Sequence, residues 1–232
     1  MLPGNEINMR AIYLKDIQSN STFVDITEKP FHHLKNVVRV RLNDKVLVLD
    51  GAGVKLISKV IEIGKKEIQL KVLSREEEKK VNRVGYVCQV KKEALELIVR
   101  QSVEIGLTEL VIVKSSRSQN FKINMARIDQ IIISAMEQSN FSFKMEVSFI
   151  DFSSLIKNMS SKLICFSTES ESSSYELLNN HDRSPLIGPE GGFSDDEIES
   201  LKKASVPLLK LKTPILRAET AFMFAQGMFS RL

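Results

Sequence analysis

The chain has 232 residues, of which 43% are hydrophobic, 6% aromatic and 27% charged, with no tryptophan. A chain of this length and hydrophobic content can bury a sizeable core, which excludes wholesale disorder, and no apolar run approaches the roughly 18 residues of a membrane-spanning helix. The net charge is +4, and the whole excess lies in residues 1–72, which carry 12 basic and 8 acidic side chains against 21 of each in the remainder.

The start of the chain and its cysteines favour a cytoplasmic protein. The segment MLPGNEINMR has no apolar stretch of the kind that a signal peptide needs. Cys88 and Cys165 lie far apart in apolar, strand-like runs, so we expect two buried thiols rather than a disulfide framework or a zinc finger. His32, His33 and His181 lack the spacing of a metal site, and we expect no metal.

The first 73 residues are typical of short strands joined by turns. Val46–Leu49 ends in Asp50–Gly53, a hairpin turn signal, and Val54–Ile63 follows. After the turn Gly64–Lys66, another apolar alternation covers Ile68–Leu73. The pattern predicts a small antiparallel barrel or curled sheet.

The positive charge of this region has two interpretations. Its basic side chains can form a face that meets a polyanion, or they can be ordinary surface residues of a small β domain, which composition alone favours. The side chains concerned are Arg10, Lys35, Arg39, Arg41, Lys45, Lys55 and Lys59.

A charged segment, Ser74–Asn82, is interpreted as a solvated linker, which divides the chain into domains 1–73 and 74–232. Beyond it, buried strands alternate with helical periodicity, which predicts an α/β domain with a mostly parallel sheet. Ser167–Ser184 is rich in Ser, Glu and Asn and is expected to be a surface stretch. The expected strands are Gly85–Val90, Leu110–Val113, Glu146–Ile150, Lys162–Phe166, Leu186–Ile187 and Leu208–Leu211, and the expected helices include Lys91–Ile105 and Ile123–Gln138.

A glycine-rich turn follows the strand that begins at Pro185, in the run PLIGPEGGFSDDEI. Ser194 and Glu197 form a capping box, so a helix starts there. The turn is either a tight strand-to-helix connection or a loop that lets a ligand approach the backbone. Phe193 and two aspartates stand where a phosphate-binding loop needs Gly-Lys-Ser/Thr, and no G-x-G-x-x-G is present. A ligand here is expected to be neutral or cationic.

A second distinctive segment, LKLKTPILRAETA, runs from a strand through a loop constrained by Pro214 into a helix. Arg217 and Glu219 lie at the helix start, where an ordinary surface ion pair is an alternative to a functional role. The helix carries an apolar stripe that belongs either to the core or to a dimer face, formed by Ala221, Phe222, Ala225, Met228 and Phe229.

Together these two segments resemble the RsmE family of 16S ribosomal RNA uridine N3-methyltransferases, within the SPOUT superfamily. The resemblance rests on GPEGGFSDDEIE (188–199) and LKTPILRAETA (211–221). It is supported by KKEALELIVRQSVEIGLTEL (91–110), SSRS (115–118), EQSN (137–140), MRAIYL (9–14) and HHLKNVVRVR (32–41), which spread over most of the chain in the expected order.

The resemblance implies a PUA-like RNA-binding β-barrel followed by an α/β domain with a deep trefoil knot that binds S-adenosylmethionine. Ile215 and Leu216 would pack the adenine, and Gly188 and Gly192 would leave room for the rest of the cofactor. The implied cofactor-binding residues are Ile187, Gly188, Pro189, Glu190, Gly191, Gly192, Leu211, Ile215, Leu216 and Thr220.

The implied reaction is methylation of N3 of one uridine, number 1498 in the usual rRNA numbering, in the assembled 30S subunit. Arg217 would stabilise negative charge on the uracil, with Glu219 orienting it or acting as general base; Glu190 is the other nearby carboxylate. A homodimer is expected, with RNA bound by Arg10, Lys35, Arg39 and Arg41. The alternatives are a SPOUT enzyme for another rRNA or tRNA position and a non-catalytic RNA-binding assembly factor.

Two features depart from the family pattern. Phe141 stands where the family usually has an arginine after E-Q-x-x, which affects one RNA or interface contact. The family usually begins near the equivalent of Met9, so Met1–Asn8 is expected to be an upstream extension.

Overall fold

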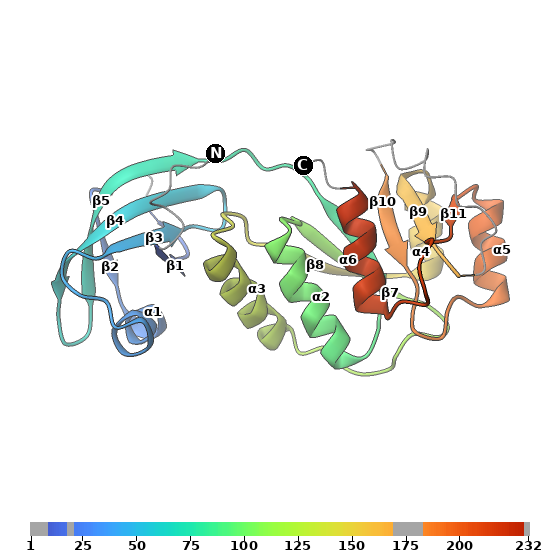
Figure 1. Cartoon of the computed structure of the whole chain (residues 1–232), viewed down its shortest axis with the longest axis horizontal. Coiled ribbons are helices and arrows are strands. Elements are labelled where there is room, and N and C mark those ends of the chain that lie inside the picture. The colour runs from blue at the N-terminus through green and yellow to red at the C-terminus, as the bar shows by residue number, and fades with distance from the viewer. Residues whose placement is uncertain (1–8, 18–20, 169–182, 230–232) are drawn as a thin grey trace. The chain divides into compact units, whose positions relative to one another are not determined.

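The computed structural model describes residues 9–17, 21–168 and 183–229 (Figure 1). They form two compact units, one within Met1–Val81 and Ile132–Lys144, the other within Asn82–Ile131 and Met145–Leu232. The predicted division at residue 73 did not anticipate that Ile132–Lys144 joins the first unit. His181, Met1–Asn8 and most of the predicted surface stretch lie outside the described residues.

The first unit is a curled five-stranded sheet in the order β1-β3-β4-β5-β2. β1 runs parallel to β3, and the other pairs are antiparallel, which corrects the expectation of a purely antiparallel sheet. The turn before Val54 is confirmed: Asp50 Oδ1 accepts hydrogen bonds from the backbone N–H of Ala52 (2.7 Å) and Val54 (2.8 Å). The strands are β1 (Arg10–Tyr13), β2 (Phe23–Ile26), β3 (Lys45–Leu49), β4 (Val54–Ile63) and β5 (Ile68–Glu77).

β5 extends beyond its predicted end. Its residues 74–77 pair with β4, from Ser74 opposite Ile57 to Glu77 opposite Val54. The prediction that Ser74–Asn82 is a linker is therefore wrong for Ser74–Glu77, because the length of β4 provides backbone partners for a charged strand end. A short helix, α1 (Glu28–His32), and a π-helical turn, His33–Val38, lie between β2 and β3.

The segment Ile132–Lys144 docks on the first unit's sheet through backbone hydrogen bonds. Gly53 N–H donates to the Ser142 carbonyl (3.1 Å), and Lys144 N–H donates to the Gly51 carbonyl (2.8 Å). The Tyr13 N–H donates to Glu137 Oε1 (2.9 Å). The EQSN motif thus has a structural role in this unit.

The second unit confirms the predicted α/β architecture with a parallel sheet in the order β11-β9-β10-β6-β7-β8. Its strands are β6 (Val84–Cys88), β7 (Glu109–Lys114), β8 (Glu146–Asp151), β9 (Leu163–Phe166), β10 (Ser184–Ile187) and β11 (Leu208–Leu209). Its helices are α2 (Lys92–Glu104), α4 (Phe152–Met159), α5 (Asp195–Lys203) and α6 (Ala218–Phe229), and α3 (Met125–Ser139) begins in it.

The helices pack on opposite faces of this sheet. Because side chains alternate along a strand, Tyr86 and Cys88 point to one face, where they form a core with Phe152 of α4 and Leu201 of α5. Gly85 points to the other face, where a Cβ atom would lie 2.7 Å from the Phe222 ring of α6. On this face α2 and α6 lie side by side (Figure 1).

The packing of α6 places part of its apolar stripe in the core. Phe222 and Ala225 are buried within the unit, and the Phe229 ring contacts Phe166 edge-on at 6.4 Å between centroids. Phe222 and Ala225 therefore belong to the core of this chain, and Ala221, Met228 and Phe229 are half-buried. Phe224, on the same helix, remains 47% exposed.

Candidate active site

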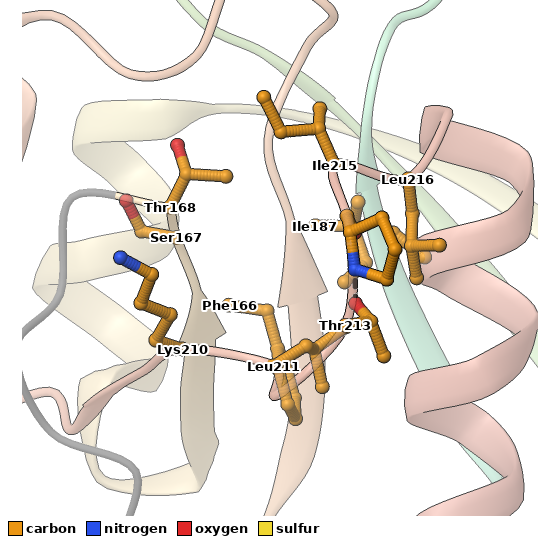
Figure 2. A pocket seen from close by; sticks show the side chains of 11 residues that line it. Phe166, Ser167, Thr168, Ile187, Lys210, Leu211, Thr213, Ile215 and Leu216 are labelled. Carbon is orange, nitrogen blue, oxygen red and sulfur yellow. Dashed lines mark hydrogen bonds between the residues drawn. The ribbon is translucent and has the colours of Figure 1, made fainter.

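A cavity of about 300 Å³ lies at the carboxyl edge of the parallel sheet. Figure 2 shows that it is surrounded by side chains from the ends of β9 and β10 and from the loop between β11 and α6. In an open parallel sheet this edge is the usual place for a ligand, and the volume is at the lower end for small-molecule sites, about 300–1,000 Å³. The lining is mostly apolar: Phe166, Ser167, Thr168, Ile187, Lys210, Leu211, Thr213, Pro214, Ile215, Leu216 and Ala221.

The glycine-rich loop next to this cavity is closed by its own backbone. Gly192 N–H donates to the Pro189 carbonyl (2.9 Å), and Gly192 has φ +70°, a conformation that disfavours side chains. At Gly188 a Cβ atom would lie 2.8 Å from the Phe193 ring, which is buried. The loop therefore requires glycine at 188 for space and at 192 for conformation.

The SSRS segment after β7 forms hydrogen bonds with the same loop and with the helix that follows it. One nitrogen of Arg117, Nη1, donates to the carbonyls of Gly191 (3.0 Å) and Phe193 (3.1 Å). The preceding residue, Ser116, donates its N–H to Glu197 Oε1 (2.8 Å). Two adjacent residues thus bind both the turn and the helix that follows it.

The predicted capping box at the start of α5 is confirmed. Glu197 N–H donates to Ser194 Oγ (3.3 Å), and Ser194 N–H donates to Glu197 Oε2 (2.9 Å). Glu197 is only 8% exposed, and both of its carboxylate oxygens accept backbone hydrogen bonds, including the one from Ser116. This carboxylate is a structural link between the two segments.

A second cavity, of about 450 Å³, adjoins the first because Leu216 lines both. Two cationic and three anionic side chains line it, so it is polar where the first is apolar. One carboxylate oxygen of Glu190, Oε1, accepts a hydrogen bond from the Lys91 N–H (3.0 Å). The lining consists of Lys91, Glu93, Ala94, Glu190, Leu216, Arg217, Ala218 and Glu219.

The two residues predicted to be catalytic, Arg217 and Glu219, both line this second cavity. Within the described part of the chain no ion pair joins them. The alternative interpretation of these two residues, a surface ion pair, is therefore wrong. Arg217 is exposed and Glu219 is half-buried, so both are accessible to a ligand in the cavity.

The residues predicted to bind a cofactor divide into groups. Ile187, Leu211, Ile215 and Leu216 line the first cavity, and the Ile215 side chain is 90% exposed. Glu190 instead lines the second cavity, and Thr220 is exposed on the first turn of α6 outside the first cavity's lining. The others form the turn between β10 and α5: Gly188, Pro189, Gly191 and Gly192.

Sequence reasoning missed two parts of the site. The end of β9 and the residues after it, Phe166–Thr168, line the first cavity, and Lys91, which follows β6 at the N-cap of α2, lines the second. Their position at the carboxyl ends of parallel strands next to β10 was the available signal, since such ends meet at one edge. Arg117 has no local signal, because its contacts are with a loop 74 residues away in the chain.

The predicted RNA-binding residues all lie in the first unit. Arg10, Arg39 and Arg41 are exposed, and Arg39 has φ +58° at the end of the π-helical turn. Lys35 is engaged within the fold: its Nζ donates to the Gly64 carbonyl (2.8 Å) and lies 4.9 Å from the Phe31 ring centroid. Phe141 packs edge-on against Phe143 at 5.8 Å between ring centroids.

The two cysteines are buried, as predicted, and neither forms a disulfide. Burial raises the pKa of Cys88 to about 12, against the opposing effect of a hydrogen bond with Ser115, and burial also raises the pKa of Cys165 well above its ordinary value. In the described ranges, no group of three or more His, Cys, Asp and Glu side chains is placed to hold a metal ion. Nor does any described helix have the length and apolar character needed to cross a membrane.

Two family models match the chain. An RNA methyltransferase domain matches residues 77–230, and an RNA methyltransferase PUA domain matches residues 26–73.

Relatives of similar length are found among known proteins. Ribosomal RNA small subunit methyltransferase E of Rickettsia conorii is 26% identical, over 92% of each chain. Ribosomal RNA small subunit methyltransferase E 2 of Borreliella burgdorferi is 27% identical, over 97% of this chain and 98% of the relative. The crystal structure of the Neisseria gonorrhoeae methyltransferase E bound to S-adenosyl methionine has a TM-score of 0.80 and 25% identity, covering 94% of this chain and 95% of that one.

Proposed function

The chain belongs to the RNA methyltransferase family, and on that premise we propose that it transfers a methyl group from S-adenosylmethionine to N3 of a uridine in 16S ribosomal RNA. Its relatives are named ribosomal RNA small subunit methyltransferases, and one solved relative was crystallised with this cofactor.

The first cavity suits S-adenosylmethionine in chemistry and size. The cofactor has no phosphate, and the cavity wall is apolar, with hydroxyl groups from Ser167 and Thr168 and one ammonium group from Lys210. Ile187, Leu211 and Leu216 provide surface for an adenine ring. When bound there, the cofactor supplies the electrophilic methyl group.

The second cavity suits the acceptor base. N3 of uridine carries a proton at neutral pH, so a base must remove it or hold the ring as its anion, which is typically worth about 10²–10⁴ in rate. Arg217 provides a cation for the charge on the uracil oxygens, and Glu219 is the carboxylate that accepts the proton or orients Arg217. One oxygen of Glu190 is occupied by the Lys91 N–H, which makes Glu219 the better candidate base.

The observation that carries this proposal is that the two cavities share Leu216, which Arg217 follows directly and Glu219 follows three residues later. A cofactor in the apolar cavity and a base in the polar one would lie next to each other at Leu216, and direct methyl transfer needs the donor methyl group and the acceptor nitrogen close together.

Finer aspects of the proposal follow from the family. We expect the target to be uridine 1498 in the assembled 30S subunit, with Arg10, Lys35, Arg39 and Arg41 contacting RNA. We also expect a trefoil knot in the second unit, and a homodimer that works in the cytoplasm, where small subunits assemble.

The experiment that tests the proposal starts from small ribosomal subunits that lack the modification. The purified protein is incubated with them and radiolabelled S-adenosylmethionine, and the labelled nucleoside is identified after digestion. Label in N3-methyluridine supports the proposal. Label in another nucleoside would indicate a methyltransferase of the same superfamily with a different target base. Cofactor binding without label would favour a non-catalytic assembly factor.

A further inference from the structure

One feature of the first unit is explained by neither its core nor the residues already assigned to RNA. The register of the sheet aligns three lysines directly across adjacent strands: Lys45 of β3 opposite Lys59 of β4, and Lys59 opposite Lys71 of β5. The next strand, β2, places Phe23 opposite Lys71. We refer to these four residues as the lysine row.

The row lies on the outer face of the sheet. Residues that are directly opposite in an antiparallel pair share a face, and the face alternates along each strand. The neighbours of the row in sequence, Val46, Val60, Leu70 and Val24, are buried in the unit's core. The row therefore points away from that core, and Phe23 is 50% exposed.

The charges of the row are not neutralised within the unit. In the described part of the chain, none of the three ammonium groups has an ion-pair or hydrogen-bond partner. Lys55 of β4, by contrast, pairs with Glu78 at 2.7 Å, and Lys35 donates to the Gly64 carbonyl. On the same face Asp25 accepts a hydrogen bond from the Gln69 side chain (2.9 Å).

Like charges directly opposite one another destabilise a sheet, so the fold gains nothing from this alignment. Adjacent strands are about 4.8 Å apart, so the Cα atoms of the three lysines span about 10 Å across the sheet. Their long side chains can reach further. The phosphates of a bound polyanion would offset this repulsion, because each would attract the neighbouring ammonium groups. An exposed aromatic ring at the end of a basic track is the combination on which single-stranded nucleic acid binds, with phosphates on the cations and a base stacked on the ring.

We propose that Lys45, Lys59, Lys71 and Phe23 form a track for a single-stranded segment of RNA on the outer face of the β1–β5 sheet. The track deepens the proposed function, on which it rests, because it names where the rRNA substrate is held. Lys71 and Phe23 were absent from the residues that sequence reasoning assigned to RNA, since only the strand register places them beside Lys45 and Lys59.

The test compares two triple variants of the full chain with the same loss of charge. The row variant carries Lys45→Gln, Lys59→Gln and Lys71→Gln. The control variant carries Lys29→Gln, Lys65→Gln and Lys66→Gln, three exposed lysines of the same unit outside the row. Binding of a 16S rRNA transcript is measured from about 50 to 200 mM salt, where phosphate contacts produce a strong salt dependence.

The row variant is expected to bind the transcript at least tenfold more weakly than the control at the lowest salt, with a log–log salt slope about 2–3 units shallower than that of the unmodified chain. Phe23→Ala is expected to weaken binding about tenfold with an unchanged slope, because it removes stacking and not charge. Melting of the row variant is expected at the same or a higher temperature, since repulsion is removed.

Equal affinities and slopes for the row and control variants would overturn the track. So would a row variant that loses binding to vesicles of anionic lipid while it keeps full affinity for the transcript. Calorimetric binding of S-adenosylmethionine to the unmodified chain tests the proposed function separately, because the row lies in a different unit from both cavities.

Discussion

Arg117 donates hydrogen bonds from a single nitrogen to the carbonyls of Gly191 (3.0 Å) and Phe193 (3.1 Å), on either side of Gly192. Gly192 is the residue of the turn with positive φ. A cation that grips both carbonyls holds the turn in this conformation without touching either cavity's lining. The SSRS motif therefore positions the loop that the proposed function requires.

Arg117→Ala is expected to weaken S-adenosylmethionine binding about tenfold, because two hydrogen bonds from a charged donor are lost at an exposed site. Turnover at saturating cofactor should change much less, since Arg217 and Glu219 lie in another segment. Calorimetric titration with the cofactor, together with initial rates at saturation, separates the two effects.

The matched control for that variant is Arg127→Ala. Arg127 is an exposed arginine of the same unit, paired with Glu96 at 3.1 Å, and such a pair is worth about 0–1 kcal/mol. It should leave cofactor affinity unchanged. An equal loss of affinity in both variants would contradict a positioning role for Arg117.

Alanine at Gly188 should destabilise the protein, whereas alanine at Gly191 should not. At Gly188 a Cβ atom would lie 2.8 Å from the buried Phe193 ring, so Gly188→Ala must displace a core side chain and is expected to cost about 1–3 kcal/mol of stability. At Gly191 the nearest atom is Arg117 Cδ at 3.6 Å, an ordinary contact, so Gly191→Ala should be tolerated. Thermal unfolding checks both, and greater destabilisation at 191 than at 188 would contradict the loop geometry.

In the second cavity, Arg217→Ala and Glu219→Gln are each expected to lower the methylation rate about 10²-fold or more while cofactor affinity changes little. The reason is that both side chains line the polar cavity, whereas the apolar cavity is lined by other residues. Single-turnover methylation of unmodified small subunits measures the loss. Near-normal turnover of Arg217→Ala with bound cofactor would exclude it from the reaction.

Glu137 should make stability depend on pH. Burial raises its pKa above 4.5, with partial opposition from the Tyr13 N–H and the charge of His33. The folded state therefore binds a proton at Glu137 more tightly than the unfolded chain does. Above the folded-state pKa, the ionised carboxylate lowers the free energy of unfolding by its full amount. This destabilisation disappears as the pH falls toward about 4.5, where the carboxyl group is protonated. Glu137→Gln keeps an acceptor for Tyr13 without ionising.

Chemical unfolding at several pH values checks this prediction. Glu137→Gln should be at least as stable as the unmodified protein at pH 7, with the difference vanishing in acid. Glu137→Ala should be less stable by about 1–3 kcal/mol throughout, because the Tyr13 donor loses its acceptor. If Glu137→Gln is less stable than the unmodified protein at pH 7, the carboxylate charge stabilises the fold and the prediction is wrong.

The two thiols should resist modification in the folded protein. Cys88, with a pKa of about 12, and the fully buried Cys165 supply almost no thiolate near pH 8, and thiolate is the reactive form. A chromogenic disulfide reagent should release both equivalents at once in guanidinium chloride and almost none in native buffer. Rapid release of one equivalent in native buffer would contradict the burial of that cysteine.

Much of the fold was predictable because its signals are local. The alternation in Val54–Ile63 predicted the bounds of β4, and Ser194 with Glu197 predicted the start of α5, since a strand's period and a capping box each involve residues close in sequence. The residues proposed for the cofactor and the base on the loop before α6 and on its first turn were likewise identifiable, because they lie within one short motif.

Only the tertiary structure decided which distant residues meet. The alignment of Lys71 with Lys59, the grip of Arg117 on Gly191 and the link from Lys91 to Glu190 each join segments far apart in the chain. Strand register and the gathering of loops at one sheet edge depend on the packing of the whole core, which no local spacing encodes. By itself, the sequence determined which residues the proposed chemistry uses, and tertiary packing decided which distant residues contact them and which side chains share the face of the proposed RNA track.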